Sequence, residues 1–227
     1  MIMIFYILGA AILLVLLYIV IEVKGSALNA FFMKALASFG FIMVFVNASF
    51  ERELLKPFIF LFLLGLVSGL LGDLFLALRP LRPKEENEML INRGILAFSI
   101  GHIFYFFGLL MISDFHYMAI VISVSVTILV IVMSYVLKFD MKKNRIPSYI
   151  YSFLIFLMVG QTIGLSSVEG FSGGPLILLI GAILFGISDL ILAPIYFKGA
   201  NDKKMVILNL MTYYGAQLLI ALSILYL

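Results

Sequence analysis

Residues 65–78, GLVSGLLGDLFLAL, form an apolar stretch that carries one carboxylate, Asp73, in its interior. Residues 181–194, GAILFGISDLILAP, repeat this pattern around Asp189. In both stretches a glycine lies eight residues before the aspartate, and Leu, any residue, Leu and Ala follow it. An ionised carboxylate inside a bilayer is costly, so each aspartate is a candidate functional residue.

The composition of the chain is that of a multi-pass membrane protein. Of 227 residues, 64% are hydrophobic and 12% are charged, whereas a soluble domain is about half apolar and a quarter charged. The mean hydropathy is +1.22. The chain has no Cys and only two His, which excludes thiolate and three-His zinc sites. The net charge of +3 lies in the connections rather than in a basic stripe, so no nucleic-acid binding is expected.

Eight segments are long and apolar enough to cross a bilayer as helices, for which about 20 residues are needed. They are residues 2–23, 29–49, 57–78, 92–112, 117–137, 147–165, 175–196 and 205–226. The first segment is too long for a signal peptide, so we expect it to be retained. Short connections predict antiparallel neighbours in an all-α polytopic bundle that forms a single domain over residues 1–227. The similar contexts of the two aspartates also suit a 4+4 parallel duplication.

The basic residues predict how the bundle is oriented in the membrane. Thirteen of the 15 Lys and Arg residues lie in or beside the odd-numbered connections, and only Arg52 and Lys56 lie in the even-numbered ones. We therefore expect the odd connections in the cytoplasm and both chain termini on the other side. The expected location is the plasma membrane.

This orientation places rare polar groups of several helices at one depth. At about 1.5 Å per residue, Asp73 lies roughly 9 Å inward from Arg79. His102, Asp189 and Tyr213 are each nine residues from a basic residue near the cytoplasmic end of their helix, which corresponds to about 13 Å. A shared band in the cytoplasmic half predicts one polar site formed by non-adjacent helices.

These polar groups also have structural explanations. Gly65, Gly69 and Asp73 share one helix face, as in a packing seam between membrane helices, although a carboxylate is a costly residue for packing alone. A lone His among aromatic residues, such as His102, is often a buried imidazole without a ligand. The stripe that contains Gln217 would equally suit hydrogen bonding between helices.

Four short motifs together resemble one family, the lysoplasmalogenase-type membrane proteins, also called the YhhN-like group. The motifs are GLVSGLLGD, which ends at Asp73; RGILAFSIGHIFY, with Arg93, His102 and Tyr105; FGISDLILA, with Ser188 and Asp189; and TYYGAQ, with Tyr213 and Gln217. Lys34 in the second segment belongs to the same pattern, but Ala35 follows it where the family usually has Pro. The likeness extends over nearly the whole chain.

The resemblance implies hydrolysis of the vinyl ether bond of lysoplasmalogens to a fatty aldehyde and a glycerophospho-base, with Asp73 and Asp189 as the catalytic pair. This reaction requires an acid to protonate the vinyl carbon and a base to activate water. Burial raises the pKa of a carboxylic acid and a nearby carboxylate raises it further, so a pair can supply both roles. The sequence does not distinguish the two roles. No metal or cofactor is expected, and the expected partners are the lysolipid substrate and membrane lipids.

Seven further residues are expected to bind or orient the substrate. They are Lys34, Arg93, His102, Tyr105, Ser188, Tyr213 and Gln217. Lys34, Arg79 and Arg93 lie near the cytoplasmic rim, where they suit a phosphate group. The alternative function is a proton-coupled transporter or a lipid-translocating or lipid-binding protein, because paired intramembrane carboxylates also carry protons. Clustering of the polar groups in one half of the bundle favours the hydrolase.

Overall fold

The computed structural model describes residues 2–50, 56–200 and 202–227. These residues form eight α-helices and contain no β-strand. The helices are α1 (Ile2–Lys24), α2 (Ala27–Phe50), α3 (Pro57–Ala77), α4 (Asn87–Leu110), α5 (Met118–Val136), α6 (Arg145–Glu169), α7 (Gly173–Phe197) and α8 (Lys203–Ser223). Short 3₁₀ turns lie in two of the connections: η1 (Arg79–Leu81), η2 (Lys84–Glu86) and η3 (Lys142–Asn144).

The predicted all-α polytopic fold is confirmed, because each predicted segment is a helix long and apolar enough to span a membrane. Pro57 begins α3, where its missing N–H removes no helical hydrogen bond. The largest shift is in α4, which begins at Asn87 rather than at residue 92. Arg52, which the sequence places in an even-numbered connection, lies outside the described residues.

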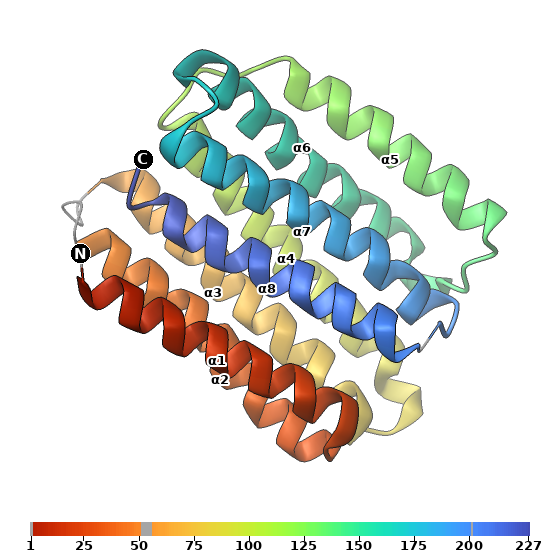
Figure 1. Cartoon of the computed structure of the whole chain (residues 1–227). Helices are drawn as coiled ribbons and strands as arrows, with labels where there is room; N and C mark the ends of the chain where they lie inside the picture. The colour runs from red at the N-terminus through yellow and green to blue at the C-terminus, as the bar shows by residue number, and fades with distance from the viewer. Residues whose placement is uncertain (1, 51–55, 201) are drawn as a thin grey trace.

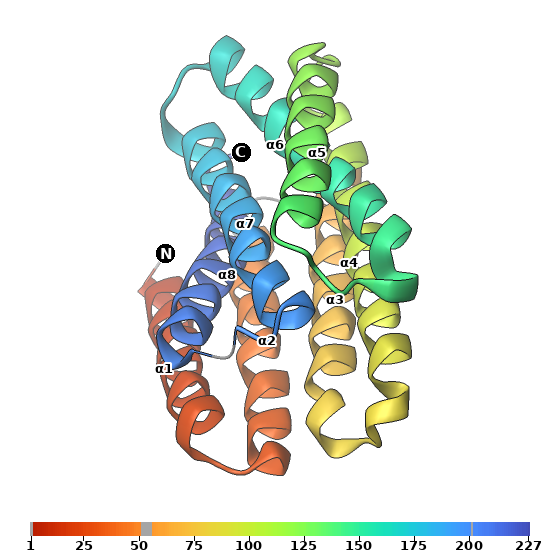
Figure 2. The ribbon, with the colours of Figure 1, turned by 90° about the vertical axis from the view of Figure 1, so that its right-hand side faces the viewer.

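Six of the helices form a closed ring. In order, α2, α3, α4, α6, α7 and α8 each pack on the next, and α8 packs back on α2. Helix α1 packs outside this ring on α2 and α8, whereas α5 packs on α6. Figures 1 and 2 show α1 and α5 on opposite sides of the bundle. The ring leaves its inner faces for a site to which several non-adjacent helices contribute.

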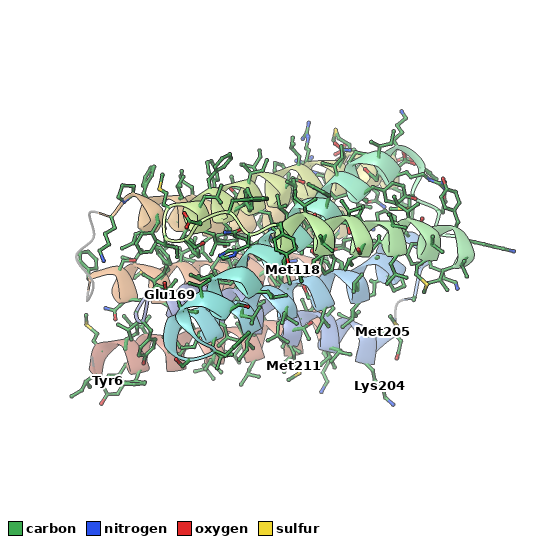
Figure 3. All side chains as sticks on the ribbon, turned by 90° about the horizontal axis from the view of Figure 1, so that it is seen from above. Tyr6, Met118, Glu169, Lys204, Met205 and Met211 are labelled. Carbon is green, nitrogen blue, oxygen red and sulfur yellow. The ribbon has the colours of Figure 1, made fainter. Side chains whose placement is uncertain are left out.

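Apolar side chains cover the outside of the bundle. Leu13 on α1 and Ile128 and Leu129 on α5 are 58%, 55% and 57% exposed. Side chains project outward along the whole length of the helices in Figure 3. Such a continuous apolar surface is unfavourable in water and stable in hydrocarbon, where helices satisfy their own backbone groups. The chain is therefore a multi-pass membrane protein.

Glycines allow close contact between neighbouring helices. A Cβ atom on Gly101 of α4 would lie 3.0 Å from the backbone oxygen of Gly65 on α3. A Cβ atom on Gly160 of α6 would lie 2.5 Å from the Cα atom of Ala119 on α5. These approaches require residues without side chains, as small-residue seams between membrane helices generally do.

Both termini lie at the same end of the bundle, as eight spans require (Figure 1). Figure 3 shows Tyr6 toward this end and Lys204 at the opposite one. The opposite end carries the odd-numbered connections, which hold most of the basic residues. Its assignment to the cytoplasm rests on these charges and stays a prediction.

Candidate active site

A cavity of about 440 Å³ extends into the bundle from the basic end, and six helices contribute to its lining. Its polar lining includes Glu22, Arg79 and Lys203 near the helix ends. Asp73 and Asp189 both line the same cavity, together with Lys34, Tyr213 and Phe98. The bundle thus brings the two aspartates of the repeated pattern, from α3 and α7, to one space.

Asp73 lies in a network of donors from α2 and α8. Its Oδ1 atom is 3.2 Å from the Lys34 ammonium. Its Oδ2 atom accepts hydrogen bonds from the Ser38 hydroxyl at 2.6 Å and from the Tyr213 hydroxyl at 2.7 Å. The Asp73 side chain is only 2% exposed, and a buried charge needs such partners. Asp73 and Lys34 therefore form a buried ion pair.

A chain of hydrogen bonds extends from Asp73 away from the cavity. The Tyr213 hydroxyl accepts a hydrogen bond from the Gln217 amide at 3.1 Å, and the Gln217 carbonyl accepts one from the Tyr105 hydroxyl at 3.3 Å. Gly69 leaves room for this amide, because a Cβ atom there would lie 2.7 Å from the Gln217 nitrogen. The glycine face of α3 therefore admits the side chains that position Tyr213.

Asp189 has a different environment. It is partly exposed in the cavity, and its Oδ2 atom accepts a hydrogen bond from the Tyr151 hydroxyl of α6. Within residues 2–50, 56–200 and 202–227, no basic side chain lies within ion-pair distance of Asp189. The two aspartates of this cavity thus differ, because, among the described residues, Asp73 has a cation beside it and Asp189 does not.

His102 lies behind the cavity wall rather than in it. It is 1% exposed and packs edge-to-face on Phe185, with ring centroids 4.6 Å apart. The rings of Tyr105 and Tyr151 lie next to it, with centroid distances of 5.9 and 5.7 Å. Neither ring nitrogen has a hydrogen-bond partner among the described residues. Because aromatic residues surround this imidazole, we assign it no contact with a substrate.

Four other predicted residues also lie apart from the cavity lining, namely Tyr105 and Gln217 of the hydrogen-bonded chain, Arg93 and Ser188. Arg93 is exposed on α4, and Ser188 is buried, with its hydroxyl donating to the Phe185 carbonyl at 2.8 Å. The Ser188 carbonyl accepts a hydrogen bond from the Asn209 amide at 2.7 Å, which links α7 to α8. Arg79, in contrast, lines the cavity.

Ser38, Tyr151 and Lys203 are among the polar residues of the site that the sequence analysis did not single out. Ser38 could have been found, because it lies four residues after Lys34 and so shares its helix face. Tyr151 is six residues from Arg145, which places it in the same depth band. Lys203 is one of the thirteen basic residues that predict the orientation in the membrane, and it also lines the cavity.

The fold and the cavity define a multi-pass helical membrane protein with two aspartates that line one polar cavity. The model of the YhhN family matches residues 29–224, and the chain belongs to this family. It is the family that the four sequence motifs resemble, so the predicted relationship is confirmed. Comparisons with curated proteins and with solved structures give no match. The matched span runs from α2 to α8 and takes in Asp73 and Asp189, whereas α1 lies before it.

Proposed function

We propose that the protein is an intramembrane hydrolase that cleaves the vinyl ether bond of lysoplasmalogen-like lysolipids, with Asp189 as the acid and Asp73 as the base. The observation that carries this proposal is the single cavity that both carboxyl groups line, each with different partners. Family membership supports the lipid substrate class.

The partners of the two aspartates decide their roles. Asp73 has the Lys34 ammonium to balance a negative charge, so it is the carboxylate that accepts a proton. Asp189 has no such cation among the described residues, and a carboxyl group in a poorly solvated place is held more easily with its proton. We therefore assign the transferable proton to Asp189, with Tyr151 holding the other oxygen in position.

The reaction then proceeds without a metal or cofactor. Asp189 protonates the vinyl carbon that bears the hydrocarbon chain, and the carbon bonded to oxygen becomes part of an oxocarbenium ion. Water adds to that carbon while Asp73 takes its proton, which forms a hemiacetal. The hemiacetal C–O bond breaks to give an aldehyde and a glycerol hydroxyl, and proton transfer restores both aspartates. One water molecule is consumed in each cycle.

The mouth of the cavity suits the phosphate of the head group. Arg79, Asn87 and Lys203 all belong to the lining of the cavity. The Arg79 guanidinium stacks over the Tyr196 ring, 4.2 Å from its centroid, which fixes its plane. A guanidinium suits a phosphate well. This end faces the cytoplasm in the proposed orientation, in the plasma membrane.

Purified protein incubated with an alkenyl lysophospholipid tests the proposal by aldehyde release. In water enriched in ¹⁸O, the glycerophospho product keeps ordinary oxygen, because water adds to the vinyl carbon and not to glycerol. Matched lysolipids with an alkyl ether or an ester yield no aldehyde. If the wild-type protein releases no aldehyde, the proposed substrate is wrong. If it only moves the lipid across a vesicle membrane, the protein is a transporter.

Variants of the two aspartates test the mechanism. General acid–base catalysis contributes about 10²–10⁴-fold, so Asp73→Asn and Asp189→Asn are each expected to lose activity within that range. Asp114→Asn, in the connection between α4 and α5, is the matched control and keeps full activity. If Asp73→Asn or Asp189→Asn keeps full activity, the replaced aspartate takes no part in the proposed mechanism.

A further inference from the structure

A second cavity, of about 90 Å³, meets the first one at Asp189. The two share five lining residues, which are Leu76, Phe98, Asp189, Leu192 and Tyr196. The rest of the lining of the second cavity is mostly apolar and comes from α4, α5, α6, α7 and the connection between α5 and α6. We call this second cavity the lateral groove. Asp189 thus stands between a polar space and an apolar one.

The lateral groove lies toward the surface that faces lipid. Leu190 of α7 lines it and is 48% exposed, and Val130 of α5 and Ala193 of α7 are partly exposed. Helix α5 packs on α6 outside the ring, so α5 and α7 form walls on either side of α6 (Figure 2). A hydrocarbon chain entering between α5 and α7 would reach Asp189 from the bilayer along a mostly apolar lining.

We propose that the lateral groove holds the hydrocarbon chain of the lysolipid where it joins the vinyl ether. This inference rests on the proposed function. In a vinyl ether, one carbon bears the chain and the next bears the glycerol oxygen. A lipid with its head group in the first cavity and its chain in the groove places the chain-bearing carbon beside Asp189. That carbon is the one that an acid must protonate.

The groove orients the substrate more than it adds affinity. Hydrocarbon that moves from a bilayer into an apolar groove leaves surroundings that are already apolar, so burial itself contributes little. Holding the reacting carbon at the acid, however, lowers the barrier to proton transfer. The effect of the groove should therefore appear in the rate with chain-bearing substrates and be absent with substrates that lack a chain.

A narrowed groove tests this role. Ala193→Phe places a large ring on the wall of the groove, and Ile187→Phe is the control, because Ile187 is 41% exposed on the same helix and lines neither cavity. Misplacing reacting atoms by about 1 Å can cost up to 10²-fold, so we expect Ala193→Phe to lose at least about tenfold in kcat/KM with a long-chain alkenyl lysophospholipid. Its activity on a vinyl ether analogue with the same head group but no hydrocarbon chain stays unchanged, as do both activities of Ile187→Phe. An equal loss of kcat/KM on both substrates, or no loss on either, would overturn the proposal that the groove holds the hydrocarbon chain.

Photolabelling of the wild-type protein tests the groove independently of catalysis. The probe is an alkyl ether lysophospholipid, which the proposed reaction does not cleave, with a diazirine on the chain close to the ether. Labelling of Val130, Leu190 or Ala193 supports the groove, whereas labelling confined to α1 and α8 overturns it. A wild-type protein that labels in the groove but releases no aldehyde contradicts the proposed function alone. Aldehyde release with labelling elsewhere contradicts the groove alone.

Discussion

Replacing Lys34 by methionine removes the cation that balances Asp73 and leaves a buried carboxylate without an ion-pair partner. Methionine keeps much of the length of lysine, so packing changes little. After the change, Asp73 still accepts hydrogen bonds from Ser38 and Tyr213 at 2.6 and 2.7 Å. Both side chains of the pair are nearly inaccessible, at 10% and 2% exposed, so solvent does not take the place of the lost cation.

The expected loss follows from these contacts. Removing one partner of a buried ion pair typically costs about 3–5 kcal/mol. The two remaining hydrogen bonds to a charged group each contribute about 1.5–3 kcal/mol and stay in place. We therefore expect Lys34→Met to lower the free energy of unfolding by about 3 kcal/mol, the lower end of the range for a broken buried ion pair.

A double-mutant cycle isolates the ion pair. The Lys34→Met/Asp73→Asn protein lacks both charges, so its loss should be smaller than the sum of the two single losses by about 2–3 kcal/mol, within the usual range for coupled contacts. The chain has no Trp and no Cys, so unfolding in mixed micelles is best followed by far-ultraviolet circular dichroism. Catalytic activity is measured on the same samples.

The control for this cycle is Lys24→Met, at the exposed end of α1. A surface change of this kind usually alters stability by no more than about 0.5 kcal/mol. If the Lys34 and Asp73 changes add within about 0.5 kcal/mol, the two groups are not coupled. That result would refute both the ion pair and the assignment of Asp73 as the carboxylate that is charged at rest.

Four further substitutions probe other contacts. Gln161→Leu breaks the hydrogen bonds between α6 and the connection from α4 to α5; it should lower the unfolding free energy by about 1–3 kcal/mol without slowing catalysis, and slower turnover would contradict a purely structural role. Gly160→Ala should cost about 1–3 kcal/mol in the same measurement, because its Cβ atom meets the backbone of α5. Gly9→Ala has open space and should gain up to about 1 kcal/mol; equal effects at both glycines would argue against the close approach. Tyr151→Phe removes the hydrogen bond to Asp189 and should lower kcat by about tenfold, from about 1.5 kcal/mol, with KM unchanged, whereas a rise in KM alone would place Tyr151 in binding.

Much of the site could be predicted because a membrane makes charge and depth informative. A carboxylate within a long apolar segment is unusual enough to mark Asp73 and Asp189 without any structure. The positive-inside rule converts distance from a basic residue into depth, and this put Tyr213 in the band where it now contacts Asp73. The departure at Ala35 does not move Lys34 away from Asp73, since the ion pair forms.

Depth alone could not distinguish residues that face the cavity from those that do not. Arg93 and His102 are nine residues apart, about two and a half helical turns, so they point to opposite sides of α4. The structure accordingly leaves Arg93 exposed and buries His102 among aromatic rings. Helical geometry separates the two residues, but only the packing of α4 against α3 and α6 shows which side is which.

The sequence by itself determined the eight membrane helices, their antiparallel order and the two aspartates at similar depth. Only the tertiary structure decided that Lys34 and Ser38 hold Asp73, that Tyr151 holds Asp189, and that an apolar groove meets the polar cavity there. The reason is physical. In a bilayer the surroundings of a helix are as apolar as its packed face, so the pattern of apolar residues leaves its rotation and its neighbours open. Contacts across the ring settle both, and they are the contacts that give the two carboxyl groups different partners.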